Sequence, residues 1–185
     1  MAGRCLDVEM LDGAYTAWMS TAPDEVDRIV AAWRRERPDL DVGPLEVLSR
    51  VSRLARHLDR ARSAAFAEHG VESWEFDVLS ALRRAGAPYE LSPGQLVTQT
   101  LVTSGTMTNR VDRLAARGLV QRLPDPHDRR GVIVRLTDDG RRTVDDAFSG
   151  LLDRERDLLA ELGPTDHHRL STLLRRLVSP FDART

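Results

Sequence analysis

The chain has 185 residues, of which 41% are hydrophobic and 30% are charged, and its formal net charge is -2 at pH 7. This length fits one ordinary domain with terminal extensions, and the composition is typical of a globular protein. No apolar run approaches the length of a membrane span and the N-terminal "MAGRCLDVEMLDG" is too acidic for a secretory signal, so we expect a cytoplasmic protein with no membrane partner.

Three helices are predicted in the first half of the chain. Residues 23–37 place Pro23 at the first helical position, with acids in the first turn and arginines in the last. Residues 43–70 form a long amphipathic segment that closes on a glycine, and residues 73–85 form a shorter helix with Ser73 as its N-cap. The apolar stripe predicted for the first helix consists of Val26, Ile29, Val30 and Trp33.

Residues 92–118 read as two short helices joined by a tight turn. Ser92 precedes a proline and begins the first helix, and Thr103 or Ser104 caps the second, which ends at Gly118. Helical spacing then predicts that one face of the second helix is buried. That face consists of Met107, Val111 and Leu114.

A pair of antiparallel strands is predicted next, over residues 119–124 and 132–137. The connection between them, "DPHDRRG", is long for a hairpin and charged, which suggests a function beyond turning the chain. Between Gln99 and Arg142 nine arginines face five aspartates, so positive charge gathers here although the whole chain is slightly acidic. Two further helices follow, a long one from Thr137 and a last one from Pro164.

This order of elements predicts a mainly α protein with a small β-wing, a winged helix-turn-helix. The second short helix would lie in the major groove of duplex DNA while wing arginines reach phosphates or the minor groove. The predicted DNA-binding residues are Thr103, Ser104, Thr106, Thr108, Asn109, Arg110, Arg113, Arg129 and Arg130. Asp125 or Asp128 would orient a wing guanidinium; the alternative for the loop is a solvated charged turn.

These segments resemble the MarR family of winged helix-turn-helix regulators, from about Asp24 to Leu177. The motifs "SGTMTNRVDRLAARGLVQR" and "DRRG" followed by "VRLTDDGR" carry the resemblance. It implies a homodimer, joined through its N- and C-terminal dimerisation helices, that binds a pseudo-palindromic operator and usually represses. The predicted organisation is an N-terminal extension over 1–22, helices for dimerisation and ligand binding over 23–70, the DNA-binding domain over 71–137 and C-terminal dimerisation helices over 138–185.

Within that family the chain is similar to the urate-responsive, PecS-like branch, through "AAWRRERPDLD" and "SWEFDVLSALRRAG". The resemblance implies an effector pocket for a small anionic ligand, urate or another purine, formed by Trp33, Asp77, Arg110 and Arg122. Each of the four also has a purely structural interpretation. Trp33 would be core, Asp77 would serve the helix dipole, Arg110 would contact phosphate only and Arg122 would be a strand-edge cation.

Other functions stay open at this stage. The effector could be a phenolic compound or a small carboxylate, the signal could be an oxidant acting on Cys5, or the winged helix could bind a protein instead of DNA. An enzyme is not expected, because no nucleophile motif and no phosphate-cradling glycine loop occur, and no cofactor is predicted. Nor is a metal, since His167 and His168 are adjacent on a predicted helix and point in different directions.

Overall fold

The computed structural model describes residues 22–126, 128 and 131–182. It divides into two compact units, Met1–Leu58 and Asp59–Thr185, whose boundary falls inside helix α3 (Gly43–Glu68). The predicted roles of Cys5, Arg129 and Arg130 fall outside the described residues, and so does nearly all of the predicted extension over 1–22.

The described part of the first unit pairs helix α2 (Glu25–Glu36) with the beginning of α3. Val26, Val30 and Val42 form its small buried cluster. The prediction that Pro23 occupies the first helical position is wrong, because Asp24 is the N-cap. Its carboxylate accepts hydrogen bonds from the backbone N–H groups of Val26 at 2.7 Å and Asp27 at 3.0 Å, so the helix begins after it.

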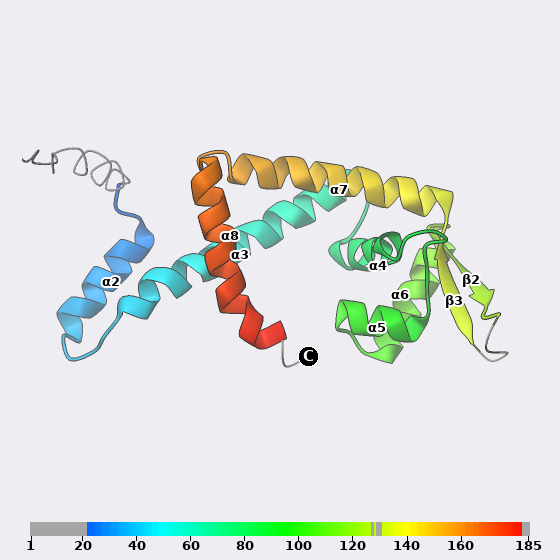
Figure 1. Ribbon diagram of the computed structural model, residues 1–185, viewed down its shortest axis with the longest axis horizontal. Coiled ribbons are helices and arrows are strands. Elements are labelled where there is room, and N and C mark those ends of the chain that lie inside the picture. Colours follow the sequence, from blue (N-terminus) through cyan, green and yellow to red (C-terminus); the bar gives the residue numbers. More distant parts are fainter. Residues whose placement is uncertain (1–21, 127, 129–130, 183–185) are drawn as a thin grey trace, which may run out of the picture. The chain divides into compact units, whose positions relative to one another are not determined.

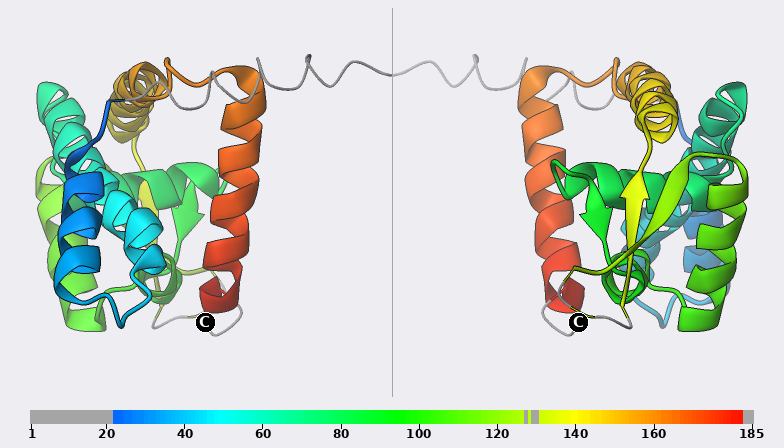
Figure 2. Two further views of the ribbon diagram at one scale, coloured as in Figure 1. Left: turned by 90° about the vertical axis from the view of Figure 1, so that its left-hand side faces the viewer. Right: turned by 90° about the vertical axis from the view of Figure 1, so that its right-hand side faces the viewer.

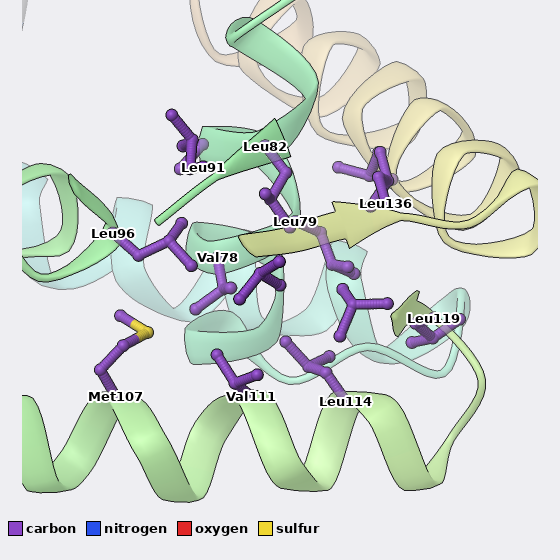
Figure 3. Close-up of a cluster of buried hydrophobic side chains, with 14 residues drawn as sticks. Val78, Leu79, Leu82, Leu91, Leu96, Met107, Val111, Leu114, Leu119 and Leu136 are labelled. Atoms are coloured by element: carbon purple, nitrogen blue, oxygen red, sulfur yellow. The ribbon is translucent and has the colours of Figure 1, made fainter. Parts of the chain in front are cut away.

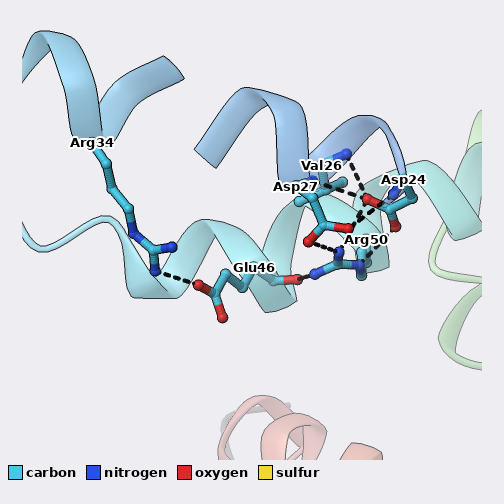
Figure 4. A network of polar contacts seen from close by, with 6 residues as sticks. All are labelled: Asp24, Val26, Asp27, Arg34, Glu46 and Arg50. Carbon is cyan, nitrogen blue, oxygen red and sulfur yellow. Dashed lines mark hydrogen bonds and ion pairs between the residues drawn. The ribbon is translucent and has the colours of Figure 1, made fainter. Parts of the chain in front are cut away.

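Charged side chains tie these two helices together (Figure 4). From α3, Arg50 donates to Asp24 at 2.8 and 3.0 Å and to Asp27 at 2.7 Å, while Arg34 of α2 donates to Glu46 of α3 at 2.5 Å. The hydrogen bond from Arg50 is the main cause that lowers the pKa of Asp24 to about 2. One aspartate thus caps α2 and anchors α3.

The second unit contains the winged helix (Figures 1 and 2). Its elements after α3 are α4 (Ser73–Arg84), β1 (Glu90–Leu91), α5 (Pro93–Thr100), α6 (Ser104–Ala116), β2 (Val120–Pro124), β3 (Val132–Leu136), α7 (Asp138–Leu158) and α8 (Pro164–Asp182). Within the described residues these strands form an antiparallel sheet in the order β1-β3-β2. Val120 pairs with Leu136 and Leu91 with Val134.

The predicted mainly α architecture with a small β-wing is confirmed. Ser92 caps α5 and Thr103 caps α6, as expected. Two local details differ. Strand β1 was not predicted, because two residues are too few to show alternation. Ser73 is the first helical residue and not the N-cap; Glu72 is the N-cap, and its N–H donates to the Glu75 carboxylate at 3.0 Å.

A single cluster of buried apolar side chains joins α4, α5, α6 and the sheet (Figure 3). Met107, Val111 and Leu114 of α6 are at most 1% exposed, which confirms the predicted face. As Figure 3 shows, they point from α6 into the cluster that contains Leu79 of α4 and Leu96 of α5. Both leucines are fully buried. This packing fixes how α6 is rotated about its own axis, and therefore which of its side chains reach solvent.

The start of α7 is fitted closely against the end of the turn after α6. Thr137 caps α7 by accepting from the N–H of Gly140 at 2.9 Å, and its hydroxyl lies 2.8 Å from the carbonyl of Gly118. A Cβ on Gly140 would lie only 2.0 Å from the backbone carbonyl oxygen of Leu119. Only a residue without a side chain allows this approach.

We therefore expect Gly140→Ala to lower the free energy of unfolding by about 2–3 kcal/mol, because the backbone at Leu119 or the start of α7 must shift. Gly94→Ala is the matched control. A Cβ there meets only the Ser92 hydroxyl at 3.8 Å, so this variant should gain up to about 1 kcal/mol from helix propensity. Urea denaturation measures both, and equal losses in the two variants would contradict the close approach.

Candidate nucleic-acid interface and adjoining cavity

Helix α6 displays most of the residues predicted to contact DNA. Its N-cap Thr103 and the helical residues Ser104, Thr106, Thr108 and Asn109 are all exposed. The Thr103 hydroxyl accepts from the N–H of Thr106 at 3.3 Å and lies 2.9 Å from its hydroxyl, which fixes the first turn. Hydroxyl and amide groups in this position suit the edges of bases in a major groove.

A second flank of α6 faces the start of α4 and is partly open to solvent. The guanidinium carbons of Arg110 and Arg113 lie 5.5 and 4.5 Å from the ring centre of Trp74. Arg113 also donates to the Glu72 carboxylate at 2.9 Å, and the Trp74 indole N–H donates to the same carboxylate at 2.7 Å. An open hollow of about 490 Å³ lies here, lined by Trp74, Gly105, Thr106, Asn109, Arg110 and Arg113.

The end of α6 contacts the start of α4 through a buried acid. Glu75 is 1% exposed and forms an ion pair with Arg117, the C-cap of α6. Arg117 also donates to the carbonyl of Gly70 at 2.8 Å. A buried carboxylate is stable only if it is paired and hydrogen-bonded, so this contact holds α6 against the α3–α4 turn.

The described part of the wing is closed by backbone hydrogen bonds. Asp125 donates its N–H to the carbonyl of Gly131 at 3.1 Å, and Gly131 donates to the carbonyl of Asp128 at 2.8 Å. A Cβ on Gly131 would lie 2.8 Å from the Cβ of Asp125, so this tight tip requires glycine. On β2, Arg122 forms an ion pair with Asp112 of α6, which links the wing to the helix.

A cavity of about 470 Å³ adjoins this interface within the second unit. It is lined by Asp59, Arg62, Ser63, Phe66, Ser73, Phe76, Asp77 and Leu151. Phe66 and Phe76 stack with ring centres 4.2 Å apart, and Arg62 donates to Glu155 of α7 at 2.6 and 2.9 Å. Although Asp77 reaches solvent, desolvation on the cavity wall raises its pKa, against the opposing effect of nearby Arg110.

The predicted effector residues therefore occupy different settings. Asp77 lines the cavity, Arg110 lies over Trp74, and Arg122 pairs with Asp112. Trp33 belongs to the first unit, where its side chain is 49% exposed. These four residues as an effector site stay a prediction.

The sequence analysis did not identify Arg62, Ser63 and Ser73 as lining the cavity, nor Trp74 as lining the hollow beside α6. A signal existed for part of this set, because Ser73 and Asp77 are four residues apart on α4 and so share a face. No spacing rule, however, relates Arg62 on α3 to α4.

Among the described residues, no group of three or more His, Cys, Asp or Glu could hold a metal ion, and no helix has the length and the apolar composition of a membrane span.

Comparison with known proteins identifies the family. A model described as MarR family matches residues 69–131. The transcriptional regulator PecS of Dickeya dadantii is 40% identical over 153 residues, which cover 83% of this chain and 92% of the relative. The chain belongs to the MarR family. The sequence-based prediction of this family, and of a similarity to PecS, is confirmed.

Solved structures of MarR proteins share the fold. A mutant MarR from Escherichia coli, complexed with operator DNA, has a TM-score of 0.62 and 27% identity over 75% of this chain and 99% of that chain. Bordetella bronchiseptica BpsR, whose DNA binding is regulated by 6-hydroxynicotinic acid, has a TM-score of 0.54 and 30% identity over 69% of this chain and 98% of that chain. The predicted class, a MarR-type transcriptional regulator, is confirmed.

The buried ion pair yields a stability prediction. Arg117→Met should lower the free energy of unfolding by about 1–3 kcal/mol, because it leaves the carboxylate of Glu75 buried with one partner fewer. Arg156→Met is the control, since Arg156 and Asp153 are each 71% exposed and such a pair contributes about 0–1 kcal/mol. Thermal and urea unfolding of both variants test this, and equal effects would show that the buried pair is no stronger than the exposed one.

Proposed function

We propose that this MarR-family protein binds duplex DNA with α6 in the major groove and the β2–β3 wing beside it. The observation that carries the proposal is the rotation of α6, which buries its apolar face and leaves Ser104, Thr108 and Asn109 exposed together. The complex of Escherichia coli MarR with operator DNA supports it at 27% identity. In the proposal Arg129 and Arg130 are the cations of the wing tip, and Asp125 or Asp128 orients them.

We also propose that the protein acts as a homodimer on a pseudo-palindromic operator. Helix α8 supports this, because its apolar side chains are exposed by 36–69% in the single chain. A run of exposed apolar side chains on one helix is typical of a surface that binds another protein. These side chains are Leu170, Leu173, Leu174, Leu177, Val178 and Phe181. A two-fold axis would place the two α6 helices about one DNA turn apart.

The effector we propose is a small aromatic anion, with urate or another purine as the first candidate. The cavity offers stacked phenyl rings, the hydroxyls of Ser63 and Ser73, and the Arg62 guanidinium, which would have to leave Glu155 to pair with a planar acid. The lining also carries Asp59 and Asp77, whose carboxyl groups disfavour an anion directly beside them. A similar protein supports the class: the DNA binding of BpsR, which is 30% identical, is regulated by 6-hydroxynicotinic acid, an aromatic carboxylic acid. An occupant here would touch α4 beside the contacts that hold α6, so it could bias DNA binding.

The DNA proposal predicts a strong dependence on salt. Binding of the protein to duplex DNA from its own upstream region should weaken about a hundred-fold or more between 50 and 200 mM salt, because phosphate contacts release counterions. Asn109→Ala should reduce discrimination for the operator by about 1–3 kcal/mol while non-specific binding remains. Fluorescence anisotropy measures both. Affinity that does not change with salt would favour a winged helix that binds a protein partner.

The effector proposal predicts which compounds release the DNA. Urate or 6-hydroxynicotinate should dissociate the complex, whereas the non-aromatic anion citrate should not. Arg62→Gln should raise the concentration required by about ten-fold, the loss of one charge-assisted contact. Arg156→Gln, an equal change of charge at an exposed site, should respond like the wild type. Trp33→Phe and Asp77→Asn test the effector residues predicted from sequence, and each should reduce release by urate while DNA binding stays intact. Tight DNA binding that ignores every aromatic anion would discard the pocket and keep the regulator.

A further inference from the structure

Arg113 is held by two neighbouring residues of the second unit at once. Its guanidinium lies over the indole of Trp74 at 4.5 Å and donates to Glu72 at 2.9 Å. The indole N–H donates to the other oxygen of the same carboxylate at 2.7 Å, so the three side chains form a closed triangle. The triangle favours one direction of the Arg113 guanidinium, along the start of α4.

Exposure distinguishes this contact from the neighbouring one at Arg117. The carboxylate of Glu75, which pairs with Arg117, is 1% exposed although Arg117 itself is 42% exposed, so a ligand from solvent does not reach the position of that carboxylate. In contrast, the Glu72 and Arg113 side chains are 59% and 54% exposed. An exposed ion pair contributes little to stability and can open readily.

The place of the triangle relates it to DNA. Trp74 and Arg113 both line the open hollow of about 490 Å³, together with Thr106 and Asn109 of the exposed α6 surface. A phosphate beside this surface would meet Arg113 from the solvent side. A phosphate and the Glu72 carboxylate are both anions that accept from the same guanidinium, so they compete for it.

We propose that Trp74 and Glu72 are positioning residues for DNA binding: Trp74 keeps the Arg113 guanidinium on the flank of α6, and Glu72 holds it until a DNA phosphate takes the place of the carboxylate. This assignment rests on the proposed DNA-binding function. Trp74 increases affinity, because it limits the rotamers that Arg113 loses on binding. Glu72 lowers affinity, because its contact with Arg113 must open first.

The experiment is a double-mutant cycle on DNA affinity with the full chain and operator duplex. Glu72→Gln should bind about three-fold more tightly than the wild type, the factor expected when an exposed ion pair no longer has to break. In the Arg113→Gln background the same substitution should have no specific effect, because no guanidinium remains to be released. Glu68→Gln is the control, since it removes the same charge from an acid that pairs with Arg154 of α7.

Trp74 is tested in the same cycle. Trp74→Leu should weaken binding about three-fold when Arg113 is present and leave the affinity of Arg113→Gln unchanged. A loss of fold would instead weaken binding equally in both backgrounds, and circular dichroism would report it. Trp74→Phe, which keeps a ring but removes the N–H donor to Glu72, should weaken binding less than Trp74→Leu.

The outcomes separate this assignment from the proposed function. If Glu72→Gln and Glu68→Gln tighten binding equally, or if Glu72→Gln acts the same with and without Arg113, only a general charge effect exists and the assignment is overturned. If no variant, the wild type included, binds duplex DNA, the proposed function fails and this assignment fails with it.

Discussion

The packing of one face of α6 sets the geometry on which the other features of the second unit depend. Because Met107, Val111 and Leu114 are buried in the common core, the helical period of 3.6 residues divides the rest of the surface in two. One part, with Asn109 and its neighbours, is open to solvent. The other carries Arg110, Arg113 and Arg117 along the start of α4. The rotation that exposes one set also directs the other.

The first turns of α4 and its N-cap contact both the cavity and helix α6. Ser73, Phe76 and Asp77 line the cavity, while Glu72, Trp74 and Glu75 hold the arginines of α6. Consecutive residues of a helix point about 100° apart, so a short segment can touch both without interruption. A ligand in the cavity and a change in α6 would therefore act on the same few backbone groups, which is a short physical route for a coupling free energy.

The sequence was sufficient for the features that local rules determine. Ser92 before Pro93, Thr103 before α6 and Thr137 before α7 each mark a helix start, and the buried face of α6 follows from spacing alone. The N-caps of α2 and α4 were misplaced, since Asp24 and Glu72 compete with equally plausible neighbours. The cavity needed residues from α3, α4 and α7 together. Contacts such as Arg62 with Glu155 join positions far apart in the chain, and no local pattern records them.

The excess of positive charge between Gln99 and Arg142 also follows from the sequence, whereas the partners of its arginines follow only from the structure. Read from the sequence, its arginines form a surplus available to DNA. In the structure many are already bound within the protein: Arg113 to Glu72, Arg117 to Glu75, Arg122 to Asp112 and Arg135 to Glu90. Three of these acids, Glu72, Glu75 and Glu90, lie outside the basic segment. The charge that a phosphate meets is therefore set by which pairs can open, and the exposure of the acid distinguishes them: the Glu75 carboxylate is buried although Arg117 is 42% exposed, whereas both Glu72 and Arg113 are exposed.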